Sequence, residues 1–465
     1  MSFGKERYFR HVTFTEGHTI ANLSAMALHP ILQEKLVAGF EPVRLEELTR
    51  RDARLPAIKN KVHTVLGMRR VGKTTFLRQV QQEQQQALAP ERAVYVSFDD
   101  DRLADLPLSQ LDALVEEYYR TFPHLRGREL VWWFFDEIQV VAGWERFVRR
   151  LMDTEKVAVV VSGSSARLLS REVHTSLRGR GFETVLRPFS FREFLRHRNE
   201  EPTKPLARLS AAERSLIEKR VLEYLQVGGF PEAQGLDLRL RIQLLQSYVD
   251  TLLLRDVVER YQVSQIAALR SITRTCLRNP AALQSAHALY RDLKSQGYAV
   301  SKDTVHALLG YLVDAFLLTL VPLATDSERQ RNANPRKIYP ADPGLIHAFD
   351  TSGRANLGRA LETAVLNALV SQGAEVGYVK TDEGFEVDFL ARIPGKRELL
   401  IQVCADPTQP EVLEREVRAL DAAARTHPRA ERILIVLTRD QAIQVSPGTI
   451  RVCAAYEWFL EEDLF

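Results

Sequence analysis

GMRRVGKTT, residues 67–75, is the stretch that decides the fold, and it follows the apolar run VHTVLG (62–67). It matches the pattern G-x-x-x-x-G-K-[ST], with a buried strand before it and the start of a helix within it. Glycines at positions 67 and 72 allow the backbone to wrap around phosphates, whose charge meets free amide groups at the helix N-terminus. The stretch therefore predicts a phosphate-binding loop.

The side chains of this loop have distinct expected roles. Lys73 should reach the β- and γ-phosphates of ATP, and the Thr74 hydroxyl should bind Mg²⁺. Thr75 is expected mainly to pack or to cap the helix. The predicted nucleotide-binding residues of the loop are Gly67, Arg70, Val71, Gly72, Lys73, Thr74 and Thr75.

An acidic pair follows a second apolar run, LVWWFFDE (130–137). A buried parallel strand that ends in Asp136 and Glu137 places both carboxylates at the sheet edge where ligands bind. Asp136 is expected to hold Mg²⁺ indirectly or through a water. Glu137 is positioned to activate the attacking water as a general base, or alternatively only to cap the following turn.

The region from 61 to about 200 alternates apolar runs with amphipathic stretches. Continuous apolar strands separated by helices predict an α/β fold with a parallel sheet covered on both faces. The expected strands are 62–67, 93–100, 130–137, 157–164 and 183–190. The fourth run ends in VVVSGSS, where Ser162 or Ser164 could lie between the γ-phosphate and the water, or could cap the helix that follows.

Bulk composition limits the class of protein. With 465 residues the chain is long enough for about three domains. A net charge of +3 requires that any nucleic-acid surface be a local patch. The three cysteines show no CxxC spacing, which argues against zinc and disulfide frameworks. Because the chain has neither a signal-type N-terminus nor an 18-residue apolar run, we expect a cytoplasmic protein without membrane contact.

Several further stretches carry a family resemblance: FFDEIQ with GWERFVRRL, SGSSARLLSREV, LRGRGFETVLRPFSFREFL, GGFPE and YVDTLLLRDVVERY. Together with GMRRVGKTT they resemble the AAA-like P-loop ATPases of bacteria and archaea that carry a restriction-endonuclease-like C-terminal domain. The resemblance covers nearly all of the chain from about residue 45. It implies an ATPase core, a helical lid, a winged-helix-like middle and a degenerate nuclease-like end.

Domain boundaries follow from this resemblance and from the helical and strand patterns. RLEELTRRDARL (44–55) is expected to be a helix that leads into the ATPase core. The expected units are a lead-in at 1–55, an ATPase core at 56–204, a helical lid at 205–265, a winged-helix-like domain at 266–350 and an endonuclease-like α/β domain at 351–465.

Within the resemblance, LRGRG (177–181) offers Arg178 and Arg180 as arginine fingers for the γ-phosphate of a neighbouring subunit, with Arg180 favoured. The alternative is an ion pair with an acidic neighbour. GGFPE (228–232) is similar to an element that brings the lid against the nucleotide, through Gly229 and Pro231, although it could be only a helix-initiating turn.

The middle region predicts a site for DNA. Ser301 should cap a helix whose start exposes Lys302 and Thr304, and such a helix enters the major groove in DNA-binding winged helices. The polar stretch TDSERQRNANP between two expected strands is interpreted as a wing loop. Its region supplies four cations for phosphates: Arg329, Arg331, Arg336 and Lys337. Asp303, which lies between Lys302 and Thr304 at the reading position of that helix, argues against base contacts, and winged helices also bind proteins.

The C-terminal region retains part of a nuclease pattern. Glu362, Asp388 and Gln402 match the helix glutamate, the strand aspartate and the position of a second carboxylate, while Cys404 stands where a lysine is required. An amide binds Mg²⁺ less readily than a carboxylate, and a thiol supplies no positive charge. The fold is therefore expected to persist without cutting.

These features together predict Mg²⁺-dependent ATP hydrolysis coupled to sequence-independent DNA binding or remodelling by a homo-oligomer. One alternative is a nucleotide-controlled switch or scaffold that binds proteins and never DNA. A second alternative is an ATP-gated, metal-dependent nuclease.

Overall fold

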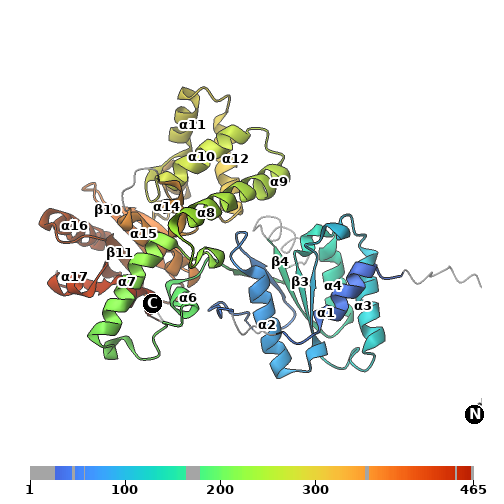
Figure 1. Ribbon diagram of the computed structural model, residues 1–465. Coiled ribbons are helices and arrows are strands. Elements are labelled where there is room, and N and C mark those ends of the chain that lie inside the picture. The colour runs from blue at the N-terminus through green and yellow to red at the C-terminus, as the bar shows by residue number, and fades with distance from the viewer. Residues whose placement is uncertain are drawn as a thin grey trace, which may run out of the picture.

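The structure is a computed structural model that describes residues 27–43, 48–56, 58–163, 179–350, 356–445 and 448–461. Its strands form two five-stranded sheets and one three-stranded sheet. Figure 1 shows the first sheet and its covering helices on one side of the molecule, and the remaining elements on the other.

The first sheet has the order β2-β3-β4-β1-β5, and all its neighbouring strands are parallel. Its strands are β1 (Val62–Leu66), β2 (Ala93–Ser97), β3 (Val131–Asp136), β4 (Val157–Gly163) and β5 (Gly181–Val185). The predicted α/β fold with a parallel sheet is thus confirmed. β5 ends before the predicted 190, because Pro188 has no N–H to continue the ladder.

Helices cover both faces of this sheet (Figure 1). One face carries α2 (Lys73–Ala87), and the other carries α1 (Pro30–Gly39), α3 (Ser109–Thr121) and α4 (Trp144–Thr154). Strand side chains alternate between the faces, so Phe134 packs on the α2 side while Trp133 and Phe135 pack on the other. Short 3₁₀ turns lie at η1 (Pro90–Arg92), η2 (Asp101–Leu103) and η3 (Ile138–Val140).

The predicted lead-in helix at 44–55 is wrong for its described part, because residues 48–55 form no helix. This segment is attached to the core through Arg51, because the buried guanidinium of Arg51 pairs with Glu193 at 2.9 Å. α1, upstream of it, packs directly on β2, where Gly39 lies so close that a Cβ would be 2.3 Å from the Tyr95 carbonyl oxygen.

The helical region expected as one lid divides between two cores. It follows α6 (Phe191–His197), and its own elements are η4 (Leu206–Arg208), α7 (Ala211–Val227), η5 (Pro231–Ala233), α8 (Leu238–Leu252), the π-helical η6 (Leu253–Val258) and α9 (Glu259–Tyr261). Ser190 and Ser210 start α6 and α7 with capping boxes. α7 packs with the C-terminal helices, whereas α8 and η6 pack with residues 65–80 of the first unit.

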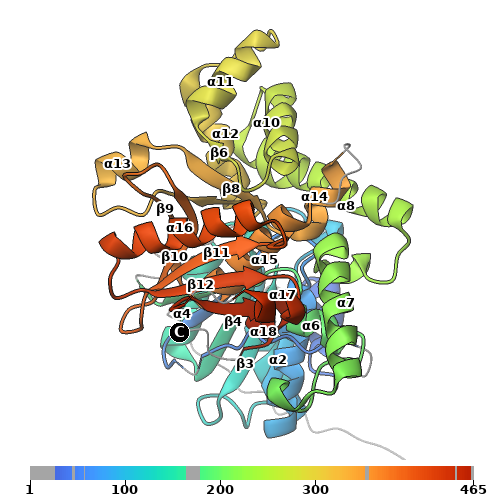
Figure 2. The same cartoon turned by 90° about the vertical axis from the view of Figure 1, so that its left-hand side faces the viewer.

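The middle region is a three-stranded antiparallel sheet of order β6-β8-β7 with its helices. Its elements are α10 (Ile266–Arg278), β6 (Leu283–Gln284), α11 (Ala286–Ser295), α12 (Lys302–Asp314), β7 (Leu318–Val321), α13 (Glu328–Ala333), β8 (Arg336–Pro340) and α14 (Pro343–Phe349). The predicted wing loop is wrong in that α13 occupies its centre, started by the Ser327 cap. α13 lies beside β9 (Figure 2). Arg331 of α13 pairs with Glu375 of β9 at 3.1 Å.

The C-terminal sheet has the order β13-β12-β11-β10-β9, antiparallel from β9 to β11 and parallel from β11 to β13. Its elements are α15 (Leu357–Ser371), β9 (Glu375–Lys380), β10 (Glu386–Arg392), β11 (Leu399–Cys404), α16 (Pro410–Thr426), β12 (Glu431–Val436), α17 (Arg439–Gln444), β13 (Arg451–Ala454) and α18 (Ala455–Leu460). α15 and α18 cover one face, and α16 covers the other.

Candidate nucleotide site

The backbone of residues 67–75, called the P-loop from here on, follows β1 and enters α2 without a break. Gly67 has a φ of 151°, and a Cβ there would lie 2.2 Å from the Leu186 carbonyl oxygen, so only glycine fits. Gly72 has a φ of 91° and stands at the N-terminus of α2. The free amides of that terminus favour an anionic ligand.

Lys73 is buried at the centre of this loop. Its Nζ donates hydrogen bonds to the carbonyl oxygens of Gly67 at 3.1 Å and Met68 at 3.2 Å. Burial lowers the pKa of Lys73, and the nearby Glu137 carboxylate opposes that shift. Val71 is buried and its carbonyl accepts from Arg51 at 2.7 Å, while Thr75 is half-buried.

Asp136 gathers three hydroxyl groups at the end of β3. Its carboxylate accepts hydrogen bonds from Thr74 at 2.7 Å, from Tyr95 at 2.6 Å and from Ser162. The hydroxyl of Thr74 and the carboxylate of Asp136 are hard oxygen donors, which fit Mg²⁺. The predicted metal-binding pair is thus placed together.

Glu137 follows Asp136 in the left-handed region, with a φ of 54°. This conformation is uncommon for a residue with a side chain and turns the chain away from the strand. The Glu137 N–H donates to the Ser162 hydroxyl at 3.0 Å, and the Glu137 carboxylate accepts from Gln139. Burial raises the pKa of Glu137, against the attraction of Lys73. Ser162 therefore ties the two acidic residues together.

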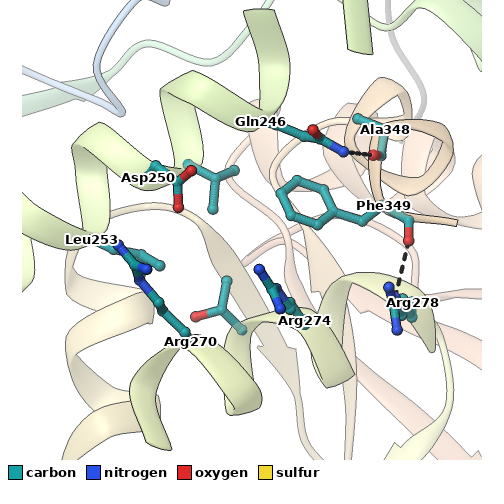
Figure 3. A pocket seen from close by; sticks show the side chains of 10 residues that line it. Gln246, Asp250, Leu253, Arg270, Arg274, Arg278, Ala348 and Phe349 are labelled. Carbon is teal, nitrogen blue, oxygen red and sulfur yellow. Dashed lines mark hydrogen bonds between the residues drawn. The ribbon is translucent and has the colours of Figure 1, made fainter. Parts of the chain in front are cut away.

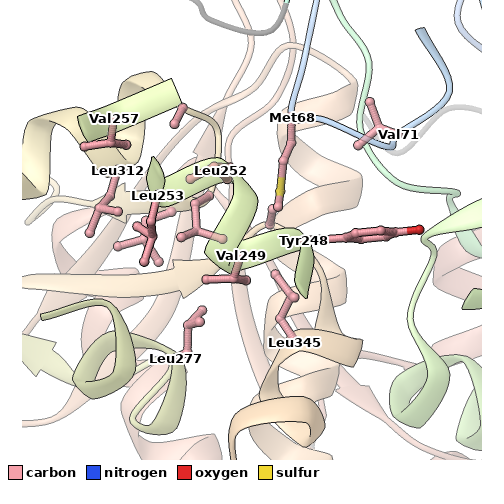
Figure 4. Packing of buried hydrophobic residues seen from close by; sticks show 14 of the residues in the cluster. Met68, Val71, Tyr248, Val249, Leu252, Leu253, Val257, Leu277, Leu312 and Leu345 are labelled. Carbon is pink, nitrogen blue, oxygen red and sulfur yellow. The ribbon is translucent and has the colours of Figure 1, made fainter. Parts of the chain in front are cut away.

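Helical residues outside the first sheet close over the P-loop. Arg69 Nε lies 2.9 and 3.0 Å from the two carboxylate oxygens of Asp256, which is buried in η6. Arg70 pairs with Glu232 at 3.3 Å. Met68 and Val71 share a hydrophobic cluster with residues of α8, including Tyr248 (Figure 4). The P-loop is thus in direct contact with the helical region 228–261.

Of the two GGFPE residues predicted to approach the nucleotide, Pro231 lies beside the P-loop, whereas Gly229 packs elsewhere. Pro231 Cγ would be 4.0 Å from a Cβ placed on Gly72. Gly229 instead approaches the backbone of Phe189, whose N–H donates to the Gly229 carbonyl at 2.7 Å, and its own N–H donates to Asp342 at 2.6 Å. The closeness of Gly229 therefore serves chain packing.

Two of the predicted residues, Ser164 and Arg178, lie outside the described residues. Arg180 forms an ion pair with Asp153, and both side chains are substantially exposed. This is the alternative that the sequence left open for Arg180. Arg255, in the same stretch as Asp256, pairs with Glu259 on the surface.

The residues predicted to contact DNA do not gather at one place. At the start of α12 Lys302 is exposed and Thr304 is half-buried, and Arg329 is exposed on α13. Arg336 donates to Asn332 at 3.3 Å, and Arg331 is held by Glu375. The prediction for Lys337 is wrong, because this side chain is buried with 2% of its surface exposed.

Lys337 reaches from β8 into the C-terminal unit. Its Nζ lies 2.8 Å from Asp388, 2.8 Å from Glu386 and 3.1 Å from Glu362. Burial raises the pKa of Glu362 to about 8, with a further increase from Asp388. The nuclease-like carboxylates are thus brought together around a lysine.

Gln402 forms hydrogen bonds with other groups of the C-terminal unit, and Cys404 is buried. Gln402 accepts from the Asp388 N–H at 3.2 Å and donates to Glu416 at 2.5 Å. Cys404 is buried, and burial raises the pKa of its thiol to about 11. Across the described ranges, no group of three or more histidine, cysteine, aspartate or glutamate side chains is arranged to hold a metal ion.

The sequence did not predict four residues that contribute to the site: Arg51, Arg69, Tyr95 and Asp256. Asp256 offered a signal, since it is a carboxylate in the otherwise apolar helical pattern of Leu252, Leu253 and Val257. A polar residue on a buried face requires a partner. Nothing in the sequence identified Arg69 as that partner. None of the described helices is long and apolar enough to cross a bilayer.

Comparison with known proteins identifies the type of domain that contains the P-loop. Residues 59–195 match the family described as an AAA domain, and residues 218–356 match a domain of unknown function. An uncharacterized protein of Methanocaldococcus jannaschii is 32% identical over 415 residues, covering 87% of this chain and 88% of that protein. One of Haemophilus influenzae is 29% identical over 334 residues, covering 71% and 79%.

Among solved structures, a Walker-type ATPase of Pyrococcus abyssi aligns with a TM-score of 0.34 and 17% identity, covering 66% of this chain and 99% of that one. The AAA match confirms the expected type of nucleotide-binding core. The chain therefore belongs to the same family as its Methanocaldococcus jannaschii relative, and it carries an AAA domain at residues 59–195.

Proposed function

We propose that this protein hydrolyses ATP with Mg²⁺ at the P-loop and transmits the state of the nucleotide to helical residues 228–261. The observation that carries the proposal is the 2.7 Å contact between Thr74 and Asp136, beside a partly buried Glu137. Bound Mg²⁺ would neutralise the charge of the phosphates during hydrolysis.

Different groups of the site bind the phosphates and activate the attacking water. The amides at the start of α2 bind the phosphates, and Lys73 exchanges its two carbonyl partners for phosphate oxygens. Glu137 takes a proton from the attacking water, and its raised pKa makes it a stronger base than an exposed carboxylate. Ser162 keeps the two acidic residues in register.

Nucleotide binding is coupled to the helical region because phosphates and carboxylates compete for the same arginines of the P-loop. Arg69 and Arg70 of the P-loop pair with Asp256 and Glu232. A triphosphate brings several negative charges to the same loop, so it competes with these carboxylates and repels them. ATP binding should therefore loosen the contact between the P-loop and η6, and phosphate release should restore it.

We further propose that the working form is a homo-oligomer on DNA. The order α10-β6-α11-α12-β7-α13-β8 is consistent with a winged-helix-like unit at 266–350, and Arg180 could reach a neighbouring subunit by leaving Asp153. The unit at 351–465 is proposed as endonuclease-like without cutting, because Lys337 and Gln402 satisfy its carboxylates.

The test is ATP hydrolysis by the wild type and Lys73→Ala, measured over a range of protein concentrations, alone and with single-stranded, duplex or branched DNA. Hydrolysis that is lost in Lys73→Ala and rises with both DNA and protein concentration supports the whole proposal. A rate that ignores DNA removes the DNA part and favours a protein-binding switch. No hydrolysis by the wild type contradicts the proposed activity.

A further inference from the structure

A row of arginines on α10 is not used by the site described above. Arg270, Arg274 and Arg278 are exposed and follow one another at intervals of four residues. The rise of an α-helix separates such neighbours by about 6 Å along one face. Among the described residues, Arg270 and Arg274 make no ion pair, and Arg278 donates only to the Phe349 carbonyl at 3.1 Å.

Two hollows adjoin this row, and all three arginines line both of them. The first, of about 280 Å³, lies between α10, α8 and the end of α14, with Phe349 and Gln246 in its wall (Figure 3). The second, of about 610 Å³, lies toward α11, with Gln296 and Tyr298 in its wall. The arginines therefore stand along a ridge that a chain-like ligand could follow.

The charge of this surface favours an anion. Asp250 lines the first hollow and Asp292 the second, but neither lies within ion-pair distance of the three guanidinium groups. Arginines without carboxylate partners keep their donors available for another anion. Planar guanidinium groups suit phosphate oxygens in particular, since two N–H groups can bind two oxygens at once.

We propose that Arg270, Arg274 and Arg278 form a binding site for a row of phosphate groups, supplied by the backbone of a nucleic-acid strand. This site deepens the proposed function, on which it rests, by assigning the DNA contact to α10 instead of the start of α12. The contact reads no bases, because the ridge presents cations to a backbone and no element to a groove.

The experiment measures binding of a fluorescent oligonucleotide by anisotropy over a range of salt concentrations. The variant is R270A/R274A/R278A, and the matched control is R120A/R146A/R418A, which removes three exposed arginines from α3, α4 and α16. A second variant, K302A/R329A/R336A, removes the cations first predicted. Inorganic tripolyphosphate serves as a competitor, to separate a nucleic-acid backbone from free polyphosphate.

The expected result is an affinity on the order of 100-fold weaker in the α10 variant, with a salt dependence reduced by about 2 log units per log unit of salt. The control should bind within about threefold of the wild type, and ATP hydrolysis without DNA should be unchanged in both. Equal binding by wild type and the α10 variant overturns this site while leaving DNA binding intact. No oligonucleotide binding by the wild type, or displacement by equimolar tripolyphosphate, overturns the nucleic-acid ligand.

Discussion

Glu137 combines a left-handed backbone, a raised pKa and a position after Asp136, the residue proposed to hold Mg²⁺. In Glu137→Gln the amide keeps the shape and the contact with Gln139 but cannot accept the proton of water. We expect hydrolysis to fall by about 10²- to 10⁴-fold while ATP still binds. Phosphate release and the binding of a fluorescent ATP analogue measure the two properties separately.

The matched control is Glu117→Gln, which removes a half-buried carboxylate paired with the exposed Arg120 on α3. Its hydrolysis should equal that of the wild type. If Glu137→Gln kept normal turnover, the residue would be a turn former and not the general base.

Lys337 compensates three carboxylates at once, and its removal leaves two of them, Glu362 and Asp388, largely buried without a cation. We expect Lys337→Met to lower the free energy of unfolding by about 3 to 5 kcal/mol, because an uncompensated buried charge is more costly than the pair is favourable. Denaturant titration measures the loss. Adding Glu362→Gln should recover part of it, since the two sites contact each other.

Lys380→Met provides the comparison, because Lys380 is exposed at the end of β9. It should change stability by less than about 0.5 kcal/mol. Equal losses in the two lysine variants would mean that the cluster around Lys337 contributes nothing specific.

Individual site residues can be predicted from the sequence when they lie close together along the chain. Gly67, Gly72 and Lys73 lie within one short motif, so their spacing alone predicts a phosphate site. Lys337 and Glu362 are 25 positions apart and belong to different units, and no local pattern predicts that contact. The prediction that Lys337 contacts DNA failed because a cation in a row of cations looks the same in the sequence whether its side chain is exposed or buried.

Among the elements, η6 allows the most direct test of the proposed coupling between the P-loop and the helical region. Its π-helical turn buries Asp256 against Arg69. Asp256→Asn removes a negative charge that opposes the phosphates, so we expect ATP to bind about tenfold more tightly, within the usual range of coupling energies. Equilibrium binding in Mg²⁺ measures this change.

Glu259→Gln is the control on the same helical stretch, because Glu259 pairs with Arg255 on the surface. Its ATP affinity should stay at the wild-type value. Weaker ATP binding by Asp256→Asn would show that Asp256 supports the P-loop instead of competing with the nucleotide.

Asp342 joins two elements, since it accepts from Gly229 and from Gly344 at the start of α14. Burial raises its pKa to about 7, above the value of about 4 for an unfolded chain. The folded state then binds more protons between these values, so the free energy of unfolding falls as the pH rises from about 4 to 7.

Asp342→Asn should lose this contribution. Between pH 5 and pH 8 the wild type should lose about 2 kcal/mol more than the variant, measured by denaturant titration at both values. Parallel pH profiles would mean that Asp342 is ionised throughout the range in the folded protein.

Strands β1 to β4 of the first sheet were predictable because their apolar runs are continuous or alternate cleanly. The end of β5 and the helix α13 were not, since β5 ends before a proline-containing bend and α13 is a short polar helix. The sequence also did not predict that α7 and α8 belong to different hydrophobic cores. Both helices have helical patterns of apolar residues, and only tertiary packing decides which core each one joins.

The whole molecule is held together by cores that cross its unit boundaries. One hydrophobic cluster contains P-loop residues such as Met68 together with residues of α8, α10 and α12, while another joins α7 to the C-terminal sheet. A change at the P-loop should therefore reach η6 and α8 directly. It should reach the C-terminal sheet only through further contacts.

Hydrogen exchange of Glu137→Gln with and without ATP and Mg²⁺ tests this arrangement. Bound nucleotide should slow exchange in residues 67–75, because it covers their amides. Exchange in residues 253–261 should become faster, because Asp256 loses Arg69, while residues 410–426 of α16 should be unchanged. Lys73→Ala, which should not bind ATP, supplies the baseline. Slower exchange throughout residues 253–261 would mean that nucleotide binding tightens the contact between the P-loop and η6, the reverse of the proposed direction.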